Sequence, residues 1–315
     1  MFILLFVSIL TLAFNIQPVR ASGTIYIRAD GSIDPPTAPI QKDGDSYTLT
    51  GNITSDGDGI VVERNNVTID GVGHSIQGTG VFPYRGIDLT EKSNVTIKSI
   101  NVRAFWIGIN LASSSNNSIS GNSIIGITTA DGFGMKLGGF SSNNTIYGNT
   151  VTYIEWGIEL GISSNNDITG NNMTNCWGGI KLGDSSNNTL TRNKMANNQI
   201  GIEFMNSSNN IIYSNNFVDN TARQAYIYSY VSNNVWDNGY PSGGNYWSDY
   251  NGTDANHDGI GDTPYVIDAN NTDNYPLMTQ YAISEFASFL IFPLFFIATL
   301  FLAIICKKRR HGGRI

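Results

Sequence analysis

A repeat of about 22 residues in the middle of the chain constrains the fold more than any other feature of the sequence. Its first marker is an Asn-Asn or Ser-Asn step, whose second Asn falls at Asn66, Asn94, Asn117, Asn144, Asn166, Asn188, Asn210 and Asn234. A second marker, Gly followed by an apolar-x-apolar triplet, falls at Gly86, Gly108, Gly134, Gly157, Gly179 and Gly201. Both markers shift together across an insertion near residues 128–133. Two independent markers with one period predict a solenoid of stacked repeats.

Within each repeat, apolar and polar residues alternate as they do along a β-strand. In residues 156–173, WGIELGISSNNDITGNNM, Ile158 and Leu160 face one way and Glu159 the other. The Ser-Asn and Gly-Asn steps favour turns and divide the repeat into three short strands. Twenty-two residues suit one coil of a parallel β-helix, whereas a propeller blade needs about 40. The sequence therefore predicts an all-β, right-handed, single-stranded parallel β-helix of about eight or nine coils.

Stacking of the coils also explains the repeated asparagines. With coils about 4.8 Å apart, an inward Asn in each turn can hydrogen-bond to the coils above and below, as in the Asn ladders of stacked sheets. Asn also tolerates the left-handed backbone of such turns. We therefore interpret these residues as structural rather than ligand-binding.

The outward residues of the Gly-apolar-x-apolar strands form a predicted column of Asp88, Asn110, Lys136, Glu159, Lys181 and Glu203. One interpretation is a ladder of surface ion pairs that helps to set the register of the coils. The other is acid–base chemistry on a polysaccharide, with Glu159, Lys181 and Glu203 as candidate catalytic residues. The coils contain no cluster of several Asp and Glu residues in sequence, which favours the first interpretation.

Aromatic residues precede the same strands at Trp106, Phe133, Trp156 and Trp177. If their rings are exposed, this spacing suits the stacking of sugar rings, and Trp106, Trp156 and Trp177 are then candidate carbohydrate-binding residues. If the rings are buried, they pack at a corner of the coil instead.

Residues 254–262, DANHDGIGD, resemble a calcium-binding loop. The ligand positions fall on Asp254, Asn256, Asp258, the carbonyl of Ile260, and Asp262, with a glycine at the sixth position. Tyr265 stands where such loops carry a bidentate glutamate, so Asp249, Asp268 or water would have to complete the shell. The spacing predicts calcium here, and a turn without metal is the alternative.

The coil pattern SSNNTISGN followed by GI-x-L resembles the NosD-like family of right-handed β-helix proteins. Residues 243–278, GGNYWSDYNGTDANHDGIGDTPYVIDANNTDNYPLM, are similar to the segment that ends the helix in archaeal NosD-like surface proteins, and SEFASF at 284–289 resembles their C-terminal sorting signals. The resemblance extends from about residue 45 to residue 306. It implies the β-helix fold and three kinds of role, which are carbohydrate binding, sugar hydrolysis and assistance in the assembly of a copper site.

The spacing of thiolate, thioether and imidazole groups, which are the ligands that copper prefers, does not indicate a copper-binding site. The candidates are scattered, at His74, His257, Cys176, Met135, Met173, Met195, Met205 and Met278. No His-x-His, Met-x-x-Met or Cys-x-x-Cys pair occurs. A copper-assembly role is therefore implied by the resemblance alone.

Both ends of the chain have the composition of targeting segments. Residues 2–16 are apolar, and Val19 and Ala21 suit a cleavage site, so we expect a signal peptide at 1–21. An uncleaved anchor is the alternative, because basic residues are missing before the apolar run. Residues 286–306 carry no charge over roughly 30 Å of helix and are followed by KKRR. This pattern predicts a single transmembrane helix with a cytoplasmic tail at 307–315 and the preceding residues outside the cell.

Between these ends we expect an N-terminal segment or cap at 22–44, β-helix repeats at 45–240, a C-terminal tail at 241–278 and a linker at 279–285. The formal net charge is −7, and no Lys/Arg cluster occurs before the last nine residues, which argues against a nucleic-acid partner. Asn-x-Ser/Thr sequons recur, and the first Asn of a pair, at Asn116, Asn143 and Asn187, is the best glycosylation candidate.

The sequence as a whole predicts a membrane-anchored cell-surface module that binds carbohydrate of the cell envelope or a surface-layer polymer. The alternatives are a polysaccharide lyase or hydrolase acting on the outer face of the β-helix, and a copper-site assembly accessory.

Overall fold

The structure is a computed structural model that describes residues 23–127, 131–228 and 232–282. The predicted signal peptide at 1–21, transmembrane helix at 286–306 and basic tail at 307–315 lie outside these residues. Within the described ranges, no helix is long and apolar enough to cross a membrane.

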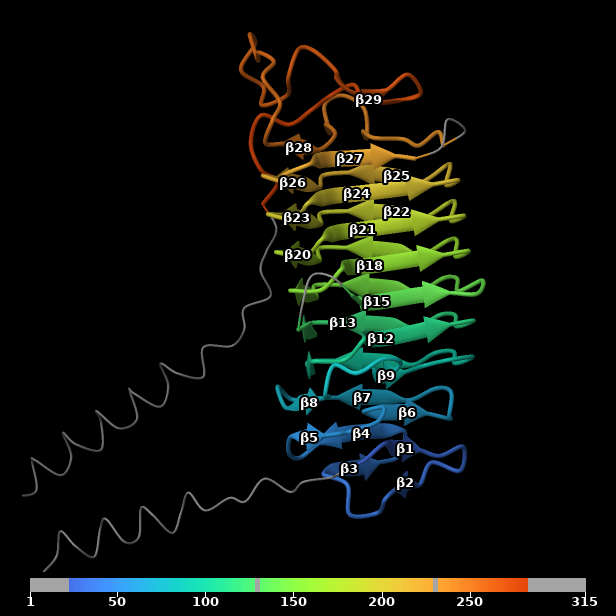
Figure 1. The fold of residues 1–315 in the computed structure, drawn as a ribbon. Helices are drawn as coiled ribbons and strands as arrows, with labels where there is room; N and C mark the ends of the chain where they lie inside the picture. Colours follow the sequence, from blue (N-terminus) through green and yellow to red (C-terminus); the bar gives the residue numbers. More distant parts are fainter. Residues whose placement is uncertain (1–22, 128–130, 229–231, 283–315) are drawn as a thin grey trace, which may run out of the picture. The chain divides into compact units, whose positions relative to one another are not determined.

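Three sheets, which we name A, B and C, run along the β-helix (Figure 1). Sheet A has the order β2 (Ile33–Asp34), β1 (Ile25–Ile27), β6 (Ile60–Val62), β9 (Arg85–Asp88), β12 (Ile107–Ala112), β15 (Phe133–Gly138), β18 (Trp156–Gly161), β21 (Gly178–Gly183), β24 (Ile200–Met205) and β27 (Arg223–Ile227). Sheet B has the order β25 (Ile211–Tyr213), β22 (Thr189–Thr191), β19 (Asp167–Thr169), β16 (Thr145–Tyr147), β13 (Ser118–Ser120), β10 (Thr96–Lys98), β7 (Thr68–Asp70), β4 (Ser46–Leu49) and β3 (Ile40–Asp43). Sheet C has the order β28 (Tyr246–Trp247), β26 (Asn216–Val218), β23 (Lys194–Ala196), β20 (Asn172–Thr174), β17 (Thr150–Thr152), β14 (Ser123–Ile125), β11 (Asn101–Arg103), β8 (Ser75–Gln77) and β5 (Ile53–Thr54).

Neighbouring strands in each sheet come from successive coils, and from β6 to β27 sheet A is parallel throughout. The predicted fold is therefore confirmed as an all-β, right-handed parallel β-helix of about eight coils, with three strands per coil. The antiparallel pairs β1–β2 and β3–β4 lie at its N-terminal end, within and next to the segment predicted at 22–44.

The core is a thin column of apolar side chains, one or two from each strand. Ile158, Leu160, Ile168 and Met173, which the alternation predicted to point inward, are all fully buried. Ile158 lies in register with Met135 on the preceding coil, and the same alignment recurs from coil to coil. In-register stacking thus completes a core that no single coil can form alone.

The predicted Asn ladder is confirmed from Asn117 to Asn234. Each side-chain Nδ2 donates to the Oδ1 of the equivalent Asn on the next coil, at 2.9 to 3.1 Å, and that Oδ1 also accepts the backbone N–H of the preceding Asn. From Asn116 to Asn209, the first Asn of each pair has a φ between 55° and 60° and turns the chain. The first Asn of the pair therefore forms the turn, and the second forms the hydrogen bonds of the ladder.

The inward position predicted for Asn66 and Asn94 was wrong, although Asn94 Nδ2 donates to Asn66 Oδ1 at 3.0 Å on the exposed side of the turn. The register of Thr68 with Thr96 and of Thr96 with Ser118 places both asparagines at the first position of the pair, where their φ values are 59° and 55°. Val67 and Val95, which follow them directly, occupy the inward position and are buried. In these two coils the inward place is therefore apolar.

A second ladder, which the sequence reasoning treated only as turns, lies at the Gly-Asn steps and at the equivalent steps Arg192-Asn193 and Ser214-Asn215. It contains Asn122, Asn149, Asn171, Asn193, Asn215 and Asn245, again linked by Nδ2–Oδ1 hydrogen bonds of 2.9 to 3.1 Å. All six side chains are buried. The turns on both sides of sheet B are therefore held by amide ladders.

Both ladders end on one strand of the C-terminal hairpin, which consists of β29 (Tyr265–Asp268) and β30 (Asn271–Asp273). Asn271 Oδ1 accepts the backbone N–H of Asn234 at 3.1 Å. Asp273 Oδ2 accepts the backbone N–H of Asn245 at 2.7 Å. The hairpin thus terminates the polar ladders, and Trp247, stacked between Phe217 and Tyr265 at 4.3 and 4.2 Å, closes the apolar column.

Candidate functional site

The outer face of sheet A carries the column of charges that the sequence predicted. Register places Lys136 beside Glu159, Glu159 beside Lys181, and Lys181 beside Glu203. Lys136 Nζ lies 2.9 Å from Glu159, and Lys181 Nζ lies 3.4 Å from Glu203. The column is therefore two separate ion pairs rather than a continuous ladder. The exposed fractions of these four side chains run only from 11% to 32%, so the pairs are partly shielded from solvent.

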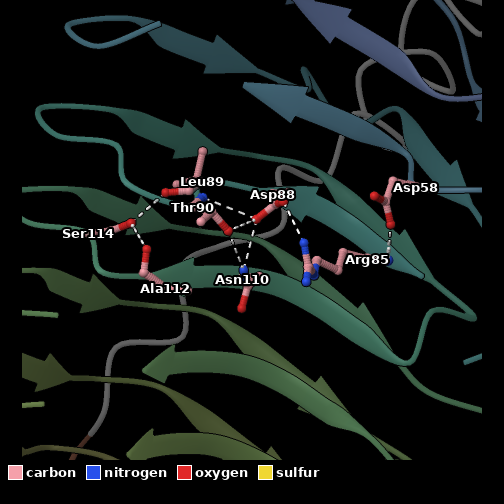
Figure 2. A network of polar contacts seen from close by, with 8 residues as sticks. All are labelled: Asp58, Arg85, Asp88, Leu89, Thr90, Asn110, Ala112 and Ser114. Atoms are coloured by element: carbon pink, nitrogen blue, oxygen red, sulfur yellow. Dashed lines mark hydrogen bonds and ion pairs between the residues drawn. The ribbon is translucent and has the colours of Figure 1, made fainter. Parts of the chain in front are cut away.

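At the other end of the column, Asp88 and Asn110 form a tight polar network (Figure 2). Asp88 Oδ1 accepts hydrogen bonds from Asn110 Nδ2 at 2.8 Å and from the hydroxyl of Thr90 at 2.7 Å. Its Oδ2 accepts from the guanidinium of Arg85 at 2.7 Å. Burial opposes ionisation of Asp88, but the hydrogen bonds from Thr90 and Asn110 and the charge of Arg85 outweigh it and lower the pKa of the carboxyl. Asp88 is thus an ionised, fully engaged carboxylate.

A row of aromatic rings borders the charged column where the strands of sheet A begin. We define the aromatic row as Phe82, Trp106, Phe133, Trp156 and Trp177. Edge-to-face contacts join Phe82 to Trp106 at 4.7 Å, Trp106 to Phe133 at 5.6 Å, and Trp156 to Trp177 at 4.9 Å between ring centroids. Phe82 is 65% exposed, Trp106, Phe133 and Trp177 are half-buried, and Trp156 is buried.

Trp156 is buried because its ring lies across Gly178 on the next coil. A Cβ at Gly178 would come within 2.2 Å of that ring, so only glycine leaves room for it. Two lysines link the row to the column: Lys136 Nζ lies 4.1 Å from the centroid of Phe133, and Lys181 Nζ lies 5.1 Å from that of Trp156. Each of the two lysines therefore contacts both a ring of the aromatic row and a carboxylate of the charged column.

Three charged side chains act on Glu155 on this surface. Burial raises the pKa of Glu155; Lys181 opposes the rise, while the negative charges of Asp131 and Glu159 add to it. Sequence reasoning missed Glu155 and Asp131, because Glu155 precedes the strand marker and Asp131 lies in the insertion. Their only sequence signal is that each stands within two residues of a ring of the aromatic row.

A pocket of about 470 Å³ lies beside Phe82 and Trp106. Gly80, Phe105, Ile127 and Asp131 complete its lining. The aromatic row therefore begins at a hollow that combines apolar walls with one carboxylate, which is the general composition of a ligand site.

The calcium-loop-like residues form a turn whose carboxylates accept hydrogen bonds from the backbone of the loop. Asp254 accepts the N–H groups of Asp258 and Gly259 at 3.1 and 2.9 Å, and Asp262 accepts that of Ala255 at 2.8 Å. Asn256 Nδ2 donates to Asp258, whose Oδ1 accepts the N–H of Ile260.

The two carboxylates proposed to complete the calcium shell have other partners. Asp249 accepts the hydroxyl of Tyr265 at 3.1 Å, and Asp268 accepts the side-chain amide of Asn271 at 2.9 Å. Among the described residues, no three His, Cys, Asp or Glu side chains form a group that could hold a metal. Calcium binding by Asp254, Asn256, Asp258, the Ile260 carbonyl and Asp262 stays a prediction.

The predicted glycosylation candidates Asn116, Asn143 and Asn187 are all exposed at the turns of the coils. Their partners in the Asn pairs are buried in the ladder. The exposure agrees with the reason for choosing the first Asn, and glycosylation itself stays a prediction.

Comparison with known proteins places the chain in a family. Residues 51–252, more than half of the chain, match the family described as periplasmic copper-binding protein (NosD). The chain belongs to the NosD family. None of the curated proteins compared with the sequence matches it.

Two solved structures illustrate which folds are similar to this NosD-family chain. A variant of the periplasmic alginate epimerase AlgG is 15% identical, with a TM-score of 0.42 over 64% of this chain and 65% of that protein. A mutant tailspike protein of E. coli bacteriophage HK620, in complex with a pentasaccharide, is 12% identical, with a TM-score of 0.31 over 77% of this chain and 61% of that protein. The chain thus spans less than two thirds of each protein.

Among the residues that the structure describes, the soft donors of this NosD-family chain do not fit a copper site. Burial raises the pKa of the Cys176 thiol to about 11, and its Sγ faces the carbonyls of Val151 and Thr174. Met135, Met173 and Met195 are buried in the core. His74 lies in a coil near the N-terminal end of the β-helix, whereas His257 lies in the C-terminal tail, so the two imidazoles are far apart in the fold. A thiol held in its neutral form inside an apolar column is a poor metal ligand.

Proposed function

We propose that the protein binds a carbohydrate polymer along the outer face of sheet A. The observation that carries this proposal is the aromatic row, which runs beside the charged column from β9 to β21. Sugar rings present C–H faces that pack on aromatic surfaces and hydroxyls that need polar partners, and this surface offers both. The same parallel register repeats the arrangement from coil to coil, which suits a polymer better than a single small molecule.

Carbohydrate binding is tested by replacing the half-buried rings of the row. We expect Trp106→Ala and Trp177→Ala each to weaken binding to an array-identified glycan by about tenfold or more, since truncation of a contact aromatic commonly costs above 1 kcal/mol. Tyr240→Ala is the matched control, because Tyr240 is 62% exposed and lies in the C-terminal tail. Equal binding by all three variants would refute the role of the row.

A second candidate function is cleavage of the bound polymer. Glu155, whose pKa burial raises, lies close enough to Glu159 to feel its charge, and pairs of carboxylates with different environments act as acid and base in glycoside hydrolysis. On this hypothesis Glu155→Gln abolishes release of reducing ends from the glycan, and unchanged release would exclude Glu155 as the acid.

We further propose that residues 286–306 tether the protein at the cell surface. The support is the uncharged run followed by KKRR, both in the sequence. The expected result is that externally added protease removes the β-helix from intact cells, while alkaline washing leaves the protein with the membrane. Release by the alkaline wash would contradict the anchor.

A further inference from the structure

The cations beside the aromatic row are already neutralised within the protein. Lys136 is paired with Glu159 at 2.9 Å, Lys181 with Glu203 at 3.4 Å, and Arg85 with Asp88 at 2.7 Å. Both lysines also lie over aromatic rings. A carboxylate or sulfate of a ligand would have to displace one of these partners before it gained a charge partner of its own. The remaining cation of sheet A, Arg223, lies over Tyr226 on β27, two strands beyond the last ring of the row.

Negative charge dominates around the centre of the row. Asp131 and Glu159 both act on Glu155, and the cation that acts on Glu155, Lys181, is itself paired with a fourth carboxylate, Glu203. An anionic sugar placed there would be repelled, because like charges disfavour each other at close range. A hydroxyl group would instead donate to these carboxylates, which accept hydrogen bonds and donate none while ionised.

From this distribution of charge we infer that the outer face of sheet A selects uncharged glycans over uronic-acid or sulfated ones. The inference rests on the proposed function and names the class of polymer. Ring faces of the glycan pack on Trp106 and Trp177, and its hydroxyls donate to Glu155 and Glu159. The ion pairs hold the lysines in place, so that they do not attract acidic polymers.

The experiment is a glycan array probed with the purified full-length protein in detergent. The array carries neutral hexose and N-acetylhexosamine oligomers beside uronic-acid and sulfated oligomers, and it is read at low and at high salt. We expect hits among the neutral oligomers, with signals that change little with salt, because no charge on the ligand is screened. Hits confined to acidic oligomers and lost at high salt would overturn the inference while leaving carbohydrate binding intact. The lack of a hit in any class would refute the proposed function itself.

A variant separates the role of the carboxylates from that of the rings. Glu155→Gln keeps the shape of the side chain but removes its charge. We expect about tenfold weaker binding of the best neutral oligomer, because one hydrogen bond to a charged acceptor is lost. Asp167→Asn is the matched control, since Asp167 is exposed on β19 of sheet B, away from this face. Stronger binding of acidic oligomers by wild type than by Glu155→Gln would contradict the inference.

Discussion

The Asn ladder makes a quantitative prediction at Asn188. Its Oδ1 accepts the backbone N–H of Asn166 at 2.9 Å and the Nδ2 of Asn166 at 3.1 Å. Its Nδ2 donates to the carbonyls of Ser163 at 3.1 Å and Ser186 at 3.2 Å and to Asn210 Oδ1 at 3.1 Å. We consider the substitution Asn188→Ala, which removes all five hydrogen bonds of a side chain that is 1% exposed.

The cost follows from which groups lose their last partner. Asn166 Nδ2 still donates to Ser141, and Asn210 Oδ1 still accepts the N–H of residue 188. The buried N–H of Asn166 and the carbonyl of Ser163 lose the partners they had in Asn188. At about 1–3 kcal/mol for each of these two unsatisfied buried groups, we expect the free energy of unfolding to fall by roughly 2–6 kcal/mol. For a protein of this size the thermal midpoint should drop by roughly 4–24 °C.

The assay is thermal unfolding of the purified protein followed by circular dichroism, with protein made in a host that does not glycosylate asparagine. Asn187→Gly is the matched control: Asn187 is exposed, and its φ of 59° is one that glycine adopts freely. We expect this control to change stability by less than about 0.5 kcal/mol. If Asn188→Ala unfolds at the same temperature as Asn187→Gly, the ladder does not stabilise the fold and the reasoning fails.

Three further predictions concern the C-terminal hairpin, the aromatic row and the tail. Burial raises the pKa of Asp273 to about 6 from 3.8, so ionisation of this carboxyl destabilises the folded state. The free energy of unfolding therefore falls by roughly 3 kcal/mol in total as pH rises from about 4 through 6. Over that range the melting temperature of wild type should fall relative to that of Asp273→Asn. Parallel pH profiles of the two proteins would contradict this. Gly178→Ala should lower the free energy of unfolding by about 1–3 kcal/mol, because the added Cβ clashes with Trp156. In Gly183→Ala, on the same strand, the added Cβ meets nothing closer than 4.0 Å, so thermal unfolding should be nearly unchanged. If residues 254–262 bind structural calcium, a chelator should lower the thermal midpoint of the purified protein, and an unchanged midpoint would exclude structural calcium there.

The periodic features of this protein were predictable from the sequence by itself. In a solenoid, residues one period apart lie side by side, so the repeat determined the three strands per coil, the inward positions of Ile158 and Met173, and the ladder from Asn117 to Asn234. The same logic placed Lys136, Glu159, Lys181 and Glu203 in one column. It misplaced Asn66 and Asn94 because in both coils the marker stands one residue early and the inward residue is the valine that follows.

The features that depend on side-chain choice or on non-periodic segments were decided only by the tertiary structure. Register puts Lys181 beside two glutamates, and its pairing with Glu203 rather than Glu159 is a choice of rotamer that no spacing reveals. Asp131, from the insertion, and Lys181, from β21, both act on Glu155, which lies in a turn outside the repeating strand. Asp273 lies 28 residues beyond Asn245, where no repeat remains to predict the contact that ends the second ladder. A period specifies neighbours along the helix axis, whereas the ends of the helix and the surface between its turns are specified only by the packed chain.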